Sequence, residues 1–273
     1  MIKLIAIDLD GTLLRDDKTI SEANIQSIQQ AIHSGVEVVI CTGRPIEGIQ
    51  FVLDQCQMNS SDHYSITYNG GLVLRNQSRE VISETIMKRE NLEKIEAVMQ
   101  ELDLPVDAVG IDAAYRMHYP KDWPGTYDQL TTYMPFYSYK SDDLQEDYHF
   151  YKIVVNTEEE HLQSQIKNLP AWLSQTYSVM QSHPYQLEVM PKGIDKGTGL
   201  EALSQYLGIQ AAEVMAIGDE QNDLAMLEWA GTGVAMANAS DEVKAHATYV
   251  TKSNGEDGVA HAIHRFILDK KEK

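Results

Sequence analysis

Four short apolar runs, each followed closely by a cluster of polar residues, constrain the fold of this chain more than any other feature. They cover residues 3–7, 36–40, 65–68 and 214–217. Runs of this length, rich in isoleucine and valine, are typical of strands that are buried on both faces of a sheet. Stretches with helical spacing separate them along the chain. The pattern predicts an α/β fold built on a doubly wound, Rossmann-like parallel sheet.

The positions of the polar clusters predict where a site would lie. In a doubly wound sheet, ligands bind beyond the carboxyl ends of the parallel strands. Each polar cluster of this sequence follows the end of a predicted strand. This coincidence is the first sign of a binding or catalytic site.

The middle of the chain has a different pattern, because tyrosines and tryptophans concentrate there and the parallel-sheet pattern stops. Its predicted strands and amphipathic helices cover residues 150–155, 178–181, 90–101 and 158–168. We therefore expect an inserted α+β domain over residues 84–186. The core domain would be formed by residues 1–83 together with 187–273, where the parallel-sheet pattern returns.

Charge excludes one large class of partners. The 273 residues include 41 acidic and 22 basic side chains, which give a formal net charge of −19. A field of that sign repels nucleic acid, so no nucleic-acid partner is expected. A small anionic ligand would need local positive charge from a metal ion, a lysine or backbone amides.

Three features of the sequence favour a cytoplasmic protein. No apolar run approaches the roughly 20 residues that a membrane helix needs, so no membrane association is expected. Asp8 interrupts the apolar N-terminus too early for a signal peptide. The two cysteines, Cys41 and Cys56, suit a reducing compartment better than a disulfide framework.

The first polar cluster contains two aspartates, Asp8 and Asp10. Side chains two residues apart in an extended segment point the same way, so both carboxylates are expected to face one site. They would repel each other unless a cation lay between them, and Mg²⁺ is the natural partner of such oxygen ligands. Gly11 would permit a tight turn near the ion. The alternative is a polar turn without a function.

Thr42, Gly43 and Lys196 would supply the groups that an anionic ligand needs. A hydroxyl and free backbone amides after a strand can hold phosphate oxygens, and a lysine at a helix start adds positive charge. Each residue also has a simpler explanation. Thr42 could cap a helix that continues through Pro45, and Lys196 could lie on a helix surface while Lys192 takes its role.

The segment 218–223 carries the densest group of oxygen ligands. Asp219 and Asp223 lie four residues apart and can share one face of a helix. Acidic residues are also favoured at helix N-termini, so capping alone could explain them. With the three other clusters, however, the segment completes a set that offers a nucleophile, a second acid, phosphate donors, a lysine and metal ligands.

Together, three of these clusters and Lys196 resemble the haloacid dehalogenase superfamily of phosphohydrolases. They are Asp-Leu-Asp-Gly-Thr at 8–12, Thr-Gly-Arg at 42–44, Lys196, and Gly-Asp-Glu-Gln-Asn-Asp at 218–223. Within this superfamily the chain resembles the Cof-type sugar phosphatases, close to the YidA-like group, which residues 66–71 and 188–197 also match. The resemblance covers both ends of the chain, with the inserted domain in the expected place.

The resemblance implies a Mg²⁺-dependent phosphatase that acts on a small phosphorylated metabolite, with sugar phosphates as the family's default. Asp8 would attack the phosphorus and form an aspartyl-phosphate. Asp10 would protonate the leaving group and then activate the water that hydrolyses the intermediate. The inserted domain would be a cap that excludes water and selects the substrate.

The resemblance also implies which residues bind the metal ion and the phosphate. Mg²⁺ would bind Asp8, the backbone carbonyl of Asp10, and Asp219, while Asp223 would support the water shell of the ion or hold Lys196. The implied catalytic set is Asp8, Asp10, Thr42 and Lys196. The implied phosphate- or substrate-binding groups are the Leu9 amide, the Thr42 hydroxyl, the Gly43 amide, Arg44, Lys196 and the Asn222 amide, with Asn69 nearby.

Two other functions stay open at this point. A phosphomutase of the same superfamily would transfer the phosphoryl group to a second sugar hydroxyl, although such mutases usually insert a helical cap after the first motif. A non-catalytic sensor of phosphorylated ligands would keep the fold without needing Asp8, Asp10 and Lys196 together. The sequence identifies neither the physiological substrate nor whether the protein is a monomer or a homodimer.

Overall fold

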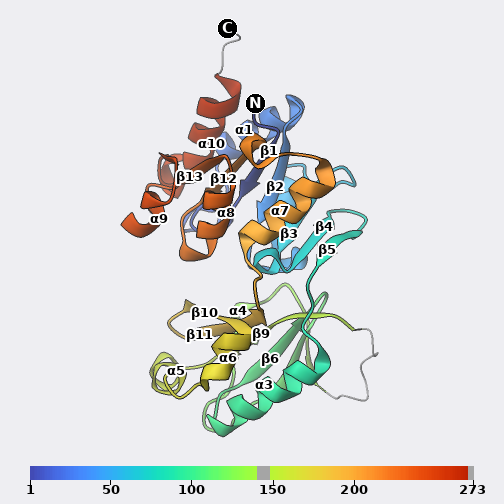
Figure 1. Ribbon diagram of the computed structural model, residues 1–273, viewed down its shortest axis with the longest axis vertical. Coiled ribbons are helices and arrows are strands. Elements are labelled where there is room, and N and C mark those ends of the chain that lie inside the picture. The colour runs from blue at the N-terminus through green and yellow to red at the C-terminus, as the bar shows by residue number, and fades with distance from the viewer. Residues whose placement is uncertain (140–147, 270–273) are drawn as a thin grey trace. The chain divides into compact units, whose positions relative to one another are not determined.

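The chain divides into two compact units, which are described separately below (Figure 1). The computed structural model describes residues 1–139 and 148–269. The first unit comprises Met1–Glu84 and Asp195–Lys273, and the second comprises Thr85–Ile194. The second unit is therefore an insertion into the first.

Within the described part of the chain, an eight-stranded sheet forms the centre of the first unit, in the order β14-β13-β12-β1-β2-β3-β4-β5. Neighbours from β14 to β3 pair in parallel, while β4 and β5 form an antiparallel extension. The strands are β1 (Leu4–Ile7), β2 (Glu37–Cys41), β3 (Tyr64–Thr67), β4 (Leu72–Arg75), β5 (Val81–Glu84), β12 (Val214–Gly218), β13 (Thr232–Ala235) and β14 (Tyr249–Val250).

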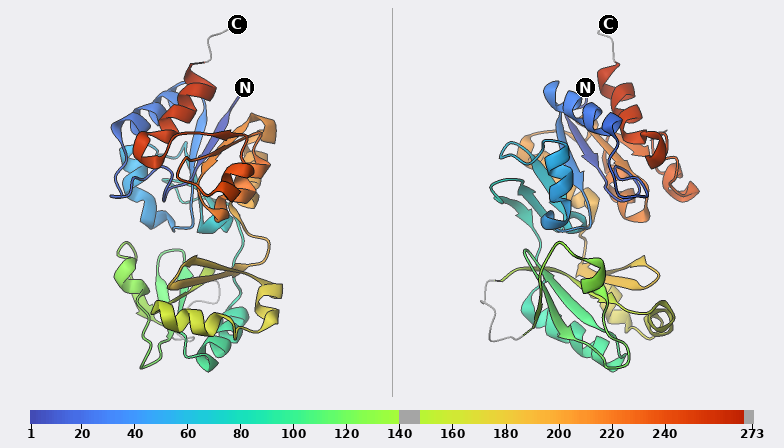
Figure 2. Two further views of the ribbon diagram at one scale, coloured as in Figure 1. Left: turned by 90° about the vertical axis from the view of Figure 1, so that its left-hand side faces the viewer. Right: turned by 180° about the vertical axis from the view of Figure 1, so that it is seen from behind.

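Helices lie on both faces of this sheet (Figures 1 and 2). On one face α7 and α8 pack against apolar strand residues that include Leu4, Val39 and Ile66. On the other face lie α1, α2 and α10. The helices are α1 (Glu22–His33), α2 (Gln50–Gln55), α7 (Lys196–Leu207), α8 (Leu224–Trp229), α9 (Asp241–Ala245) and α10 (Gly258–Ile263), with short turns η1 (Ile46–Ile49), η2 (Tyr68–Gly70), η4 (Ala211–Glu213), η5 (Gln221–Asp223), η6 (Asn254–Glu256) and η7 (His264–Leu268). The doubly wound parallel sheet predicted from the sequence is confirmed.

The second unit is an α+β unit, as predicted. Over the described residues its sheet has six strands in the order β10-β11-β9-β6-β7-β8, antiparallel except for the pair β7 and β8. Helices α3, α5 and α6 cover one face, where Leu92, Leu162 and Leu173 join apolar strand residues in a core. The elements are α3 (Arg89–Glu101), β6 (Val106–Gly110), β7 (Ala114–His118), α4 (Tyr127–Leu130), β8 (Phe136–Ser138), β9 (Phe150–Asn156), α5 (Glu159–Ile166), α6 (Ala171–Thr176), β10 (Tyr177–His183) and β11 (Gln186–Pro191). No helix in either described range is long and apolar enough to cross a bilayer.

The opposite face of the second sheet carries buried polar side chains, which we call the polar network of the second unit: Lys152, Asn156, Gln186 and Glu188. Lys152 of β9 and Glu188 of β11 form an ion pair with Nζ and Oε1 3.0 Å apart. Gln186 donates to the same oxygen at 2.9 Å, and Asn156 donates to Gln186 at 3.1 Å. Because side chains alternate along a strand, Lys152 lies on the face opposite Ile153, which belongs to the apolar core.

The boundary at the end of the inserted unit differs from the sequence expectation. We expected the insertion to end at residue 186, whereas the second unit continues to Ile194. The reason is that β11 pairs with β10 on one side and β9 on the other, so it is an inner strand of the second sheet.

Candidate active site

Strand β1 places Asp8 directly after its carboxyl end, in the middle of the first sheet. It lies between β12 and β2, and its residues are fully buried. The amide of Asp8 donates to the Ile217 carbonyl at 2.9 Å, which continues the β1–β12 pairing by one residue. The chain then turns at Gly11, where φ is +82° and a Cβ would overlap Oδ2 of Asp219. Glycine is therefore required for this turn to approach that carboxylate.

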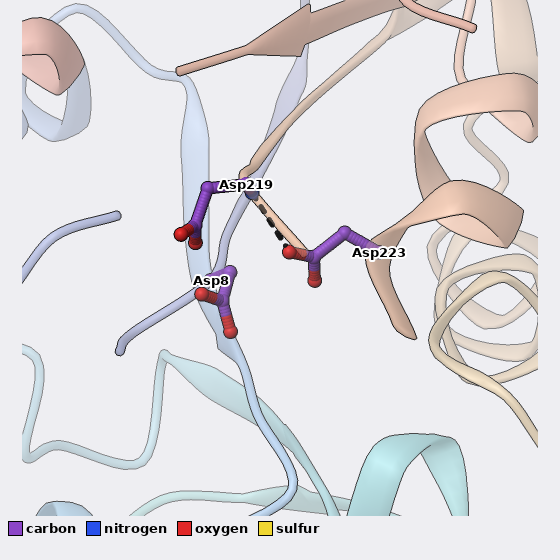
Figure 3. Close-up of side chains that lie close together, drawn as sticks. All are labelled: Asp8, Asp219 and Asp223. Atoms are coloured by element: carbon purple, nitrogen blue, oxygen red, sulfur yellow. Dashed lines mark hydrogen bonds between the residues drawn. The ribbon is translucent and has the colours of Figure 1, made fainter. Parts of the chain in front are cut away.

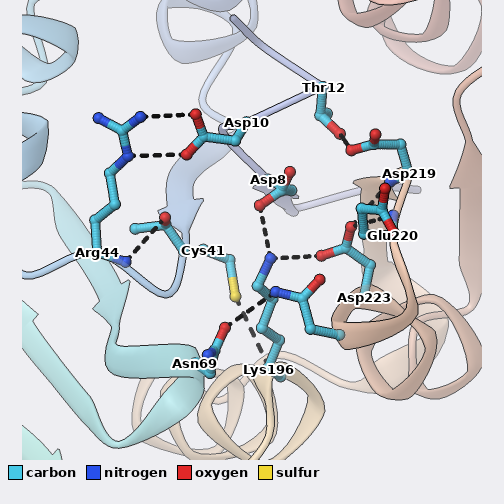
Figure 4. Close-up of polar contacts among 12 residues, drawn as sticks. Asp8, Asp10, Thr12, Cys41, Arg44, Asn69, Lys196, Asp219, Glu220 and Asp223 are labelled. Carbon is cyan, nitrogen blue, oxygen red and sulfur yellow. Dashed lines mark hydrogen bonds and ion pairs between the residues drawn. The ribbon is translucent and has the colours of Figure 1, made fainter. Parts of the chain in front are cut away.

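Lys196 is the buried cation of the site. It begins α7, and Asp195 caps this helix by accepting a hydrogen bond from the Thr198 amide at 2.8 Å. Its Nζ lies 2.6 Å from Oδ1 of Asp8 and 2.6 Å from Oδ1 of Asp223 (Figure 4). Only 1% of the side chain is exposed. The structure thus joins residues that are 188 positions apart in the sequence.

Three carboxylates lie close together in the site (Figure 3). One oxygen of each of Asp8, Asp219 and Asp223 lies within 4.8 Å of the others, and all three residues are buried. Oδ2 of Asp223 accepts hydrogen bonds from the amides of Asp219 at 2.9 Å and Glu220 at 3.0 Å. Capping therefore accounts for one oxygen of Asp223, while Lys196 contacts the other. We call these three residues the acidic group.

Both oxygens of Asp219 are held by neighbouring side chains. The Thr12 hydroxyl donates to Oδ1 at 2.8 Å, and Asn238 donates from Nδ2 to Oδ2 at 3.1 Å. Asn238 also donates to the Gly11 carbonyl at 2.8 Å. Our sequence analysis named Thr12 only as part of the motif at 8–12, without a role, and it missed Asn238. The available signal was that Asn238 closely follows the end of β13, a parallel strand, just as the other clusters follow theirs.

The acidic group carries more negative charge than Lys196 can balance. Burial, followed by the charge of Asp223, raises the pKa of Asp8 to about 8, although Lys196 opposes the shift. Burial also raises the pKa of Asp219 to about 6, with the Thr12 hydrogen bond opposing and the charge of Asp223 adding to the rise. A bound divalent cation would relieve this repulsion, and an all-oxygen donor set is the one that hard cations prefer. The group can therefore hold a metal ion.

The side chain of Asp10 is engaged elsewhere. Arg44 donates from Nε to Oδ2 at 2.8 Å and from Nη2 to Oδ1 at 2.6 Å (Figure 4). Lys18 donates to Oδ1 at 2.9 Å. Burial alone would raise the pKa of Asp10, but the hydrogen bond and charge of Arg44, with those of Lys18, outweigh it and lower the pKa. Among the described residues, the acidic group does not include the Asp10 carboxylate. The predicted metal ligand of Asp10 is its backbone carbonyl and not its carboxylate. The side-chain contacts do not test this prediction.

Residues after β2 and β3 bring hydrogen-bonding groups together. The Thr42 hydroxyl accepts from the Arg44 amide at 3.2 Å, and the Thr42 carbonyl accepts from the Asn69 amide at 2.9 Å. Asn222 donates from Nδ2 to Oδ1 of Asn69 at 3.2 Å. Gly43 passes close to the Asn69 side chain, which a Cβ would meet at 3.0 Å. The Thr-Gly motif and Asn222 are therefore linked through Asn69.

Two further candidates are placed clearly by the structure. The Leu9 side chain is fully buried, so only its backbone can serve a ligand. Lys192, the alternative to Lys196, is exposed, belongs to the second unit and donates to the Ser174 carbonyl at 2.8 Å. Lys196 is therefore the lysine that contacts Asp8.

Comparisons with known proteins identify the family. The family model for haloacid dehalogenase-like hydrolases matches the sequence over residues 5–263. A Bacillus subtilis (strain 168) protein named "Putative phosphatase YxeH" is 38% identical over 99% of this chain and 100% of its own length. A second protein of that strain, named 5-amino-6-(5-phospho-D-ribitylamino)uracil phosphatase YcsE, is 30% identical over 98% of this chain and 96% of its own.

A solved structure supports the same assignment. It is described as the subclass IIB sugar phosphatase BT4131, and it matches with a TM-score of 0.77 and 25% identity. The match covers 97% of this chain and 98% of that protein. Its extent includes both units described above. The chain therefore belongs to the haloacid dehalogenase-like hydrolase family, as one of its phosphatases.

Proposed function

We propose that the chain is a Mg²⁺-dependent phosphatase that hydrolyses phosphate monoesters of small sugar-like metabolites through an aspartyl-phosphate on Asp8. One observation carries the proposal: the contact of Lys196 with Asp8 inside a buried, negatively charged group. A nucleophilic carboxylate, a cation for the phosphoryl group and carboxylates for a metal ion thus share the carboxyl edge of one parallel sheet.

The residues present fit Mg²⁺. The acidic group offers only oxygen donors, and burial together with the charge of Asp223 raises the pKa of Asp8 and Asp219, which favours a bound cation there. Asp8, the Asp10 carbonyl and Asp219 would hold the ion, and Asp223 would hold Lys196. Once bound, Mg²⁺ supplies positive charge that neutralises the carboxylates and the phosphoryl oxygens. Thr12 and Asn238 keep the Asp219 carboxylate oriented toward this position.

In the first half-reaction a carboxylate oxygen of Asp8 bonds to phosphorus, and the bond from phosphorus to the leaving oxygen breaks. Asp10 donates the proton that the leaving alkoxide requires, and it must take up this proton before the step, because Arg44 and Lys18 lower its pKa. Lys196 stabilises the charge on the phosphoryl group and, since it is nearly fully buried, it does so with little screening by water. The phosphate oxygens would be held by the amides of Leu9 and Gly43, the Thr42 hydroxyl and the Asn222 amide.

In the second half-reaction Asp10 accepts a proton from a water molecule as that water attacks phosphorus. The bond between Asp8 and phosphorus breaks, and inorganic phosphate leaves. The carboxylate of Asp8 is regenerated with Lys196 beside it. One residue, Asp10, therefore donates a proton in one half-reaction and accepts one in the other.

The names of two relatives support the substrate class. YcsE is named for a substrate with a phosphorylated ribityl chain, and BT4131 is described as a sugar phosphatase. We therefore propose that the substrate is a small, polyhydroxylated metabolite with one phosphate ester, selected by the second unit. Because both cysteines are buried and free, we also propose that the enzyme works in the reducing cytoplasm.

The proposal is tested by measuring phosphate release from sugar and sugar-alcohol phosphates with Mg²⁺ and with EDTA. We expect release that requires Mg²⁺, a phosphorylated protein after rapid acid quenching, and neither signal for Asp8→Asn. Lys196→Ala should lose activity, whereas the exposed Lys192→Ala is its matched control and should keep it. Phosphate release by Asp8→Asn at the wild-type rate, or no release from any substrate, would overturn the proposal.

A further inference from the structure

Arg44 contacts Asp10 in a way that phosphate binding does not explain. Sequence analysis placed Arg44 among the phosphate-binding groups, but its guanidinium makes two parallel hydrogen bonds to the two oxygens of the Asp10 carboxylate. Such a paired contact fixes both the position and the plane of a carboxylate, because the guanidinium fork is rigid. Arg44 and Asp10 are separated by 34 positions in the sequence, so folding, and not local structure, creates the contact.

We propose that Arg44 is a positioning residue, which holds the Asp10 carboxylate in the orientation needed for proton transfer. The inference rests on the proposed function, in which Asp10 is the general acid and base. It assigns to Arg44 a role that acts through Asp10 and not through direct contact with the phosphate.

The surroundings of the two side chains favour this role. The Asp10 side chain is 42% exposed and the Arg44 side chain 24% exposed, so without Arg44 the carboxylate would keep only the single hydrogen bond from Lys18. Arg44 is itself anchored, since its amide donates to the Thr42 hydroxyl and Nη1 donates to the Gly48 carbonyl at 3.4 Å. A guanidinium that is held at several points can orient a mobile carboxylate.

Lys18 provides an internal comparison. It also contacts Asp10, but through one hydrogen bond to Oδ1, and its side chain is 63% exposed. A single flexible ammonium adds charge without setting the plane of the carboxylate. We therefore expect Arg44, and not Lys18, to determine where Asp10 points.

Through the Arg44 amide, the same residue also contacts the proposed phosphate-binding motif. The Thr42 hydroxyl accepts a hydrogen bond from this amide at 3.2 Å. The placement of Asp10 is thereby coupled to the backbone that follows β2. This link explains why an arginine directly after Thr42 and Gly43 can serve proton transfer.

A double-mutant cycle tests the inference with Arg44→Gln, Asp10→Asn and the combined variant, assayed on a sugar phosphate. Asp10→Asn should lower kcat by about 10²- to 10⁴-fold, the usual contribution of a general acid or base. Arg44→Gln should lower kcat by about 10- to 100-fold, the cost of a misplaced group, with KM changed less than about threefold. In the Asp10→Asn background, Arg44→Gln should change kcat by less than about threefold.

Leaving-group dependence gives a second readout that a purely structural role would not produce. An alkoxide needs a proton to leave, whereas p-nitrophenolate does not. Arg44→Gln and Asp10→Asn should therefore both reduce kcat/KM less for p-nitrophenyl phosphate than for the sugar phosphate. Arg44→Lys should restore part of kcat, and Lys18→Ala should leave both substrates within about threefold of wild type, as an exposed ion pair contributes little.

The outcomes separate this inference from the proposed function. Normal turnover by Asp10→Asn would overturn the role of Asp10 and with it the proposed mechanism. If Asp10→Asn is impaired but the effects of the two substitutions multiply, or if Arg44→Gln raises KM with kcat unchanged, Arg44 binds phosphate directly and the inference is wrong. Thermal unfolding of each variant shows that it is folded under the assay conditions.

Discussion

Each unit buries a lysine, but the two lysines have opposite surroundings. Over the described residues, the buried lysines are Lys196 in the first unit and Lys152 in the second. Lys196 contacts two carboxylates, with a third beside them. Lys152 pairs with Glu188, whose oxygen is also hydrogen-bonded by Gln186. Charge is balanced in the polar network of the second unit and unbalanced in the acidic group of the first.

This difference separates a structural role from a functional one. Burial alone would lower the pKa of both lysines, but the neighbouring carboxylates outweigh it and raise the pKa in each case. Both ammonium groups are therefore charged at neutral pH. The charges of the polar network balance without a further ion, whereas the acidic group has more carboxylates than Lys196 can pair with. We infer that an excess of buried charge, and not a buried ion pair as such, marks the site that binds a ligand.

The largest expected effect tests the unbalanced site. Asp8→Asn should abolish turnover, with kcat reduced on the order of 10⁴-fold or more, because the nucleophile is lost. The same substitution removes a carboxyl group whose ionisation burial disfavours, and it leaves Lys196 paired with Asp223. Without added metal, the free energy of unfolding should therefore stay equal or rise, as measured by urea denaturation. A variant that is inactive only because it is less stable would contradict this account.

The balanced pair should respond in the opposite way. Glu188→Gln leaves the Lys152 ammonium buried without its carboxylate, and breaking such a pair typically costs about 3–5 kcal/mol. Urea denaturation should show this loss. Lys152→Met combined with Glu188→Leu should recover much of it, because no charge is then left unpaired. If Glu188→Gln is as stable as wild type, the pair is not the structural element that we describe.

Asp107 offers a pH test within the second unit. It is fully buried on β6 and accepts a hydrogen bond from the Tyr119 hydroxyl at 2.8 Å. Burial raises its pKa to about 7, although Tyr119 opposes the shift. The folded state thus binds a proton that the unfolded state releases near pH 4, so this contribution to stability is full below pH 4 and is lost as pH rises through 7.

The difference between wild type and Asp107→Asn isolates that contribution. Stability relative to this variant should fall on the order of 3 kcal/mol between pH 4 and 7 and then level off. Unfolding curves at a series of pH values measure it. Asp8→Asn serves as the control in the first unit. Its free energy of unfolding should keep the part of the pH dependence that Asp107 causes. A constant difference between wild type and Asp107→Asn at all pH values would show that Asp107 does not titrate in this range.

The smallest expected effect concerns metal binding. Mg²⁺ at 100 times its Kd should stabilise the protein by about 2.7 kcal/mol, the value for a ligand that binds only the folded state. Asp219→Asn should lose this stabilisation. Glu188→Gln should be less stable than wild type without Mg²⁺, but Mg²⁺ should stabilise it by the same amount. Unfolding with Mg²⁺ and with EDTA provides the measurement. Equal stabilisation of Asp219→Asn and wild type would place the ion outside the acidic group.

The central part of the site could be predicted because strand ends in a parallel sheet converge. Asp8 follows β1, and Asp219 and Asp223 follow β12, its neighbour in the sheet. Short apolar runs in the sequence identify such strands. Because the strands are parallel, their carboxyl ends lie at the same side of the sheet. Lys196 was a candidate because it opens a predicted helix, with Lys192 as the alternative, and the structure identifies Lys196 as the lysine that contacts Asp8.

Side-chain pairing could not be predicted in the same way. Residue spacing alone indicated that Asp10 and Asp8 face one site, yet the Asp10 carboxylate is hydrogen-bonded by Arg44 and Lys18 and does not belong to the acidic group. Lys152 lies in the predicted strand 150–155, but its pairing with Glu188 depends on the register of β9 and β11. Local sequence patterns determine neither the rotamer of a side chain nor the register of two strands that are distant in the sequence.

The fixed start of α7 has a consequence for how proteins of this kind can diversify. Asp195 begins the first unit again after the insertion, caps the helix and directly precedes Lys196. Its carbonyl packs so closely on Gly70 that a Cβ there would overlap it. The helix start is thus fixed by the first unit itself. An insertion of different length or sequence could replace residues 85–194 without displacing the lysine from Asp8, which makes Asp195 a suitable junction for exchanging inserted units between related enzymes.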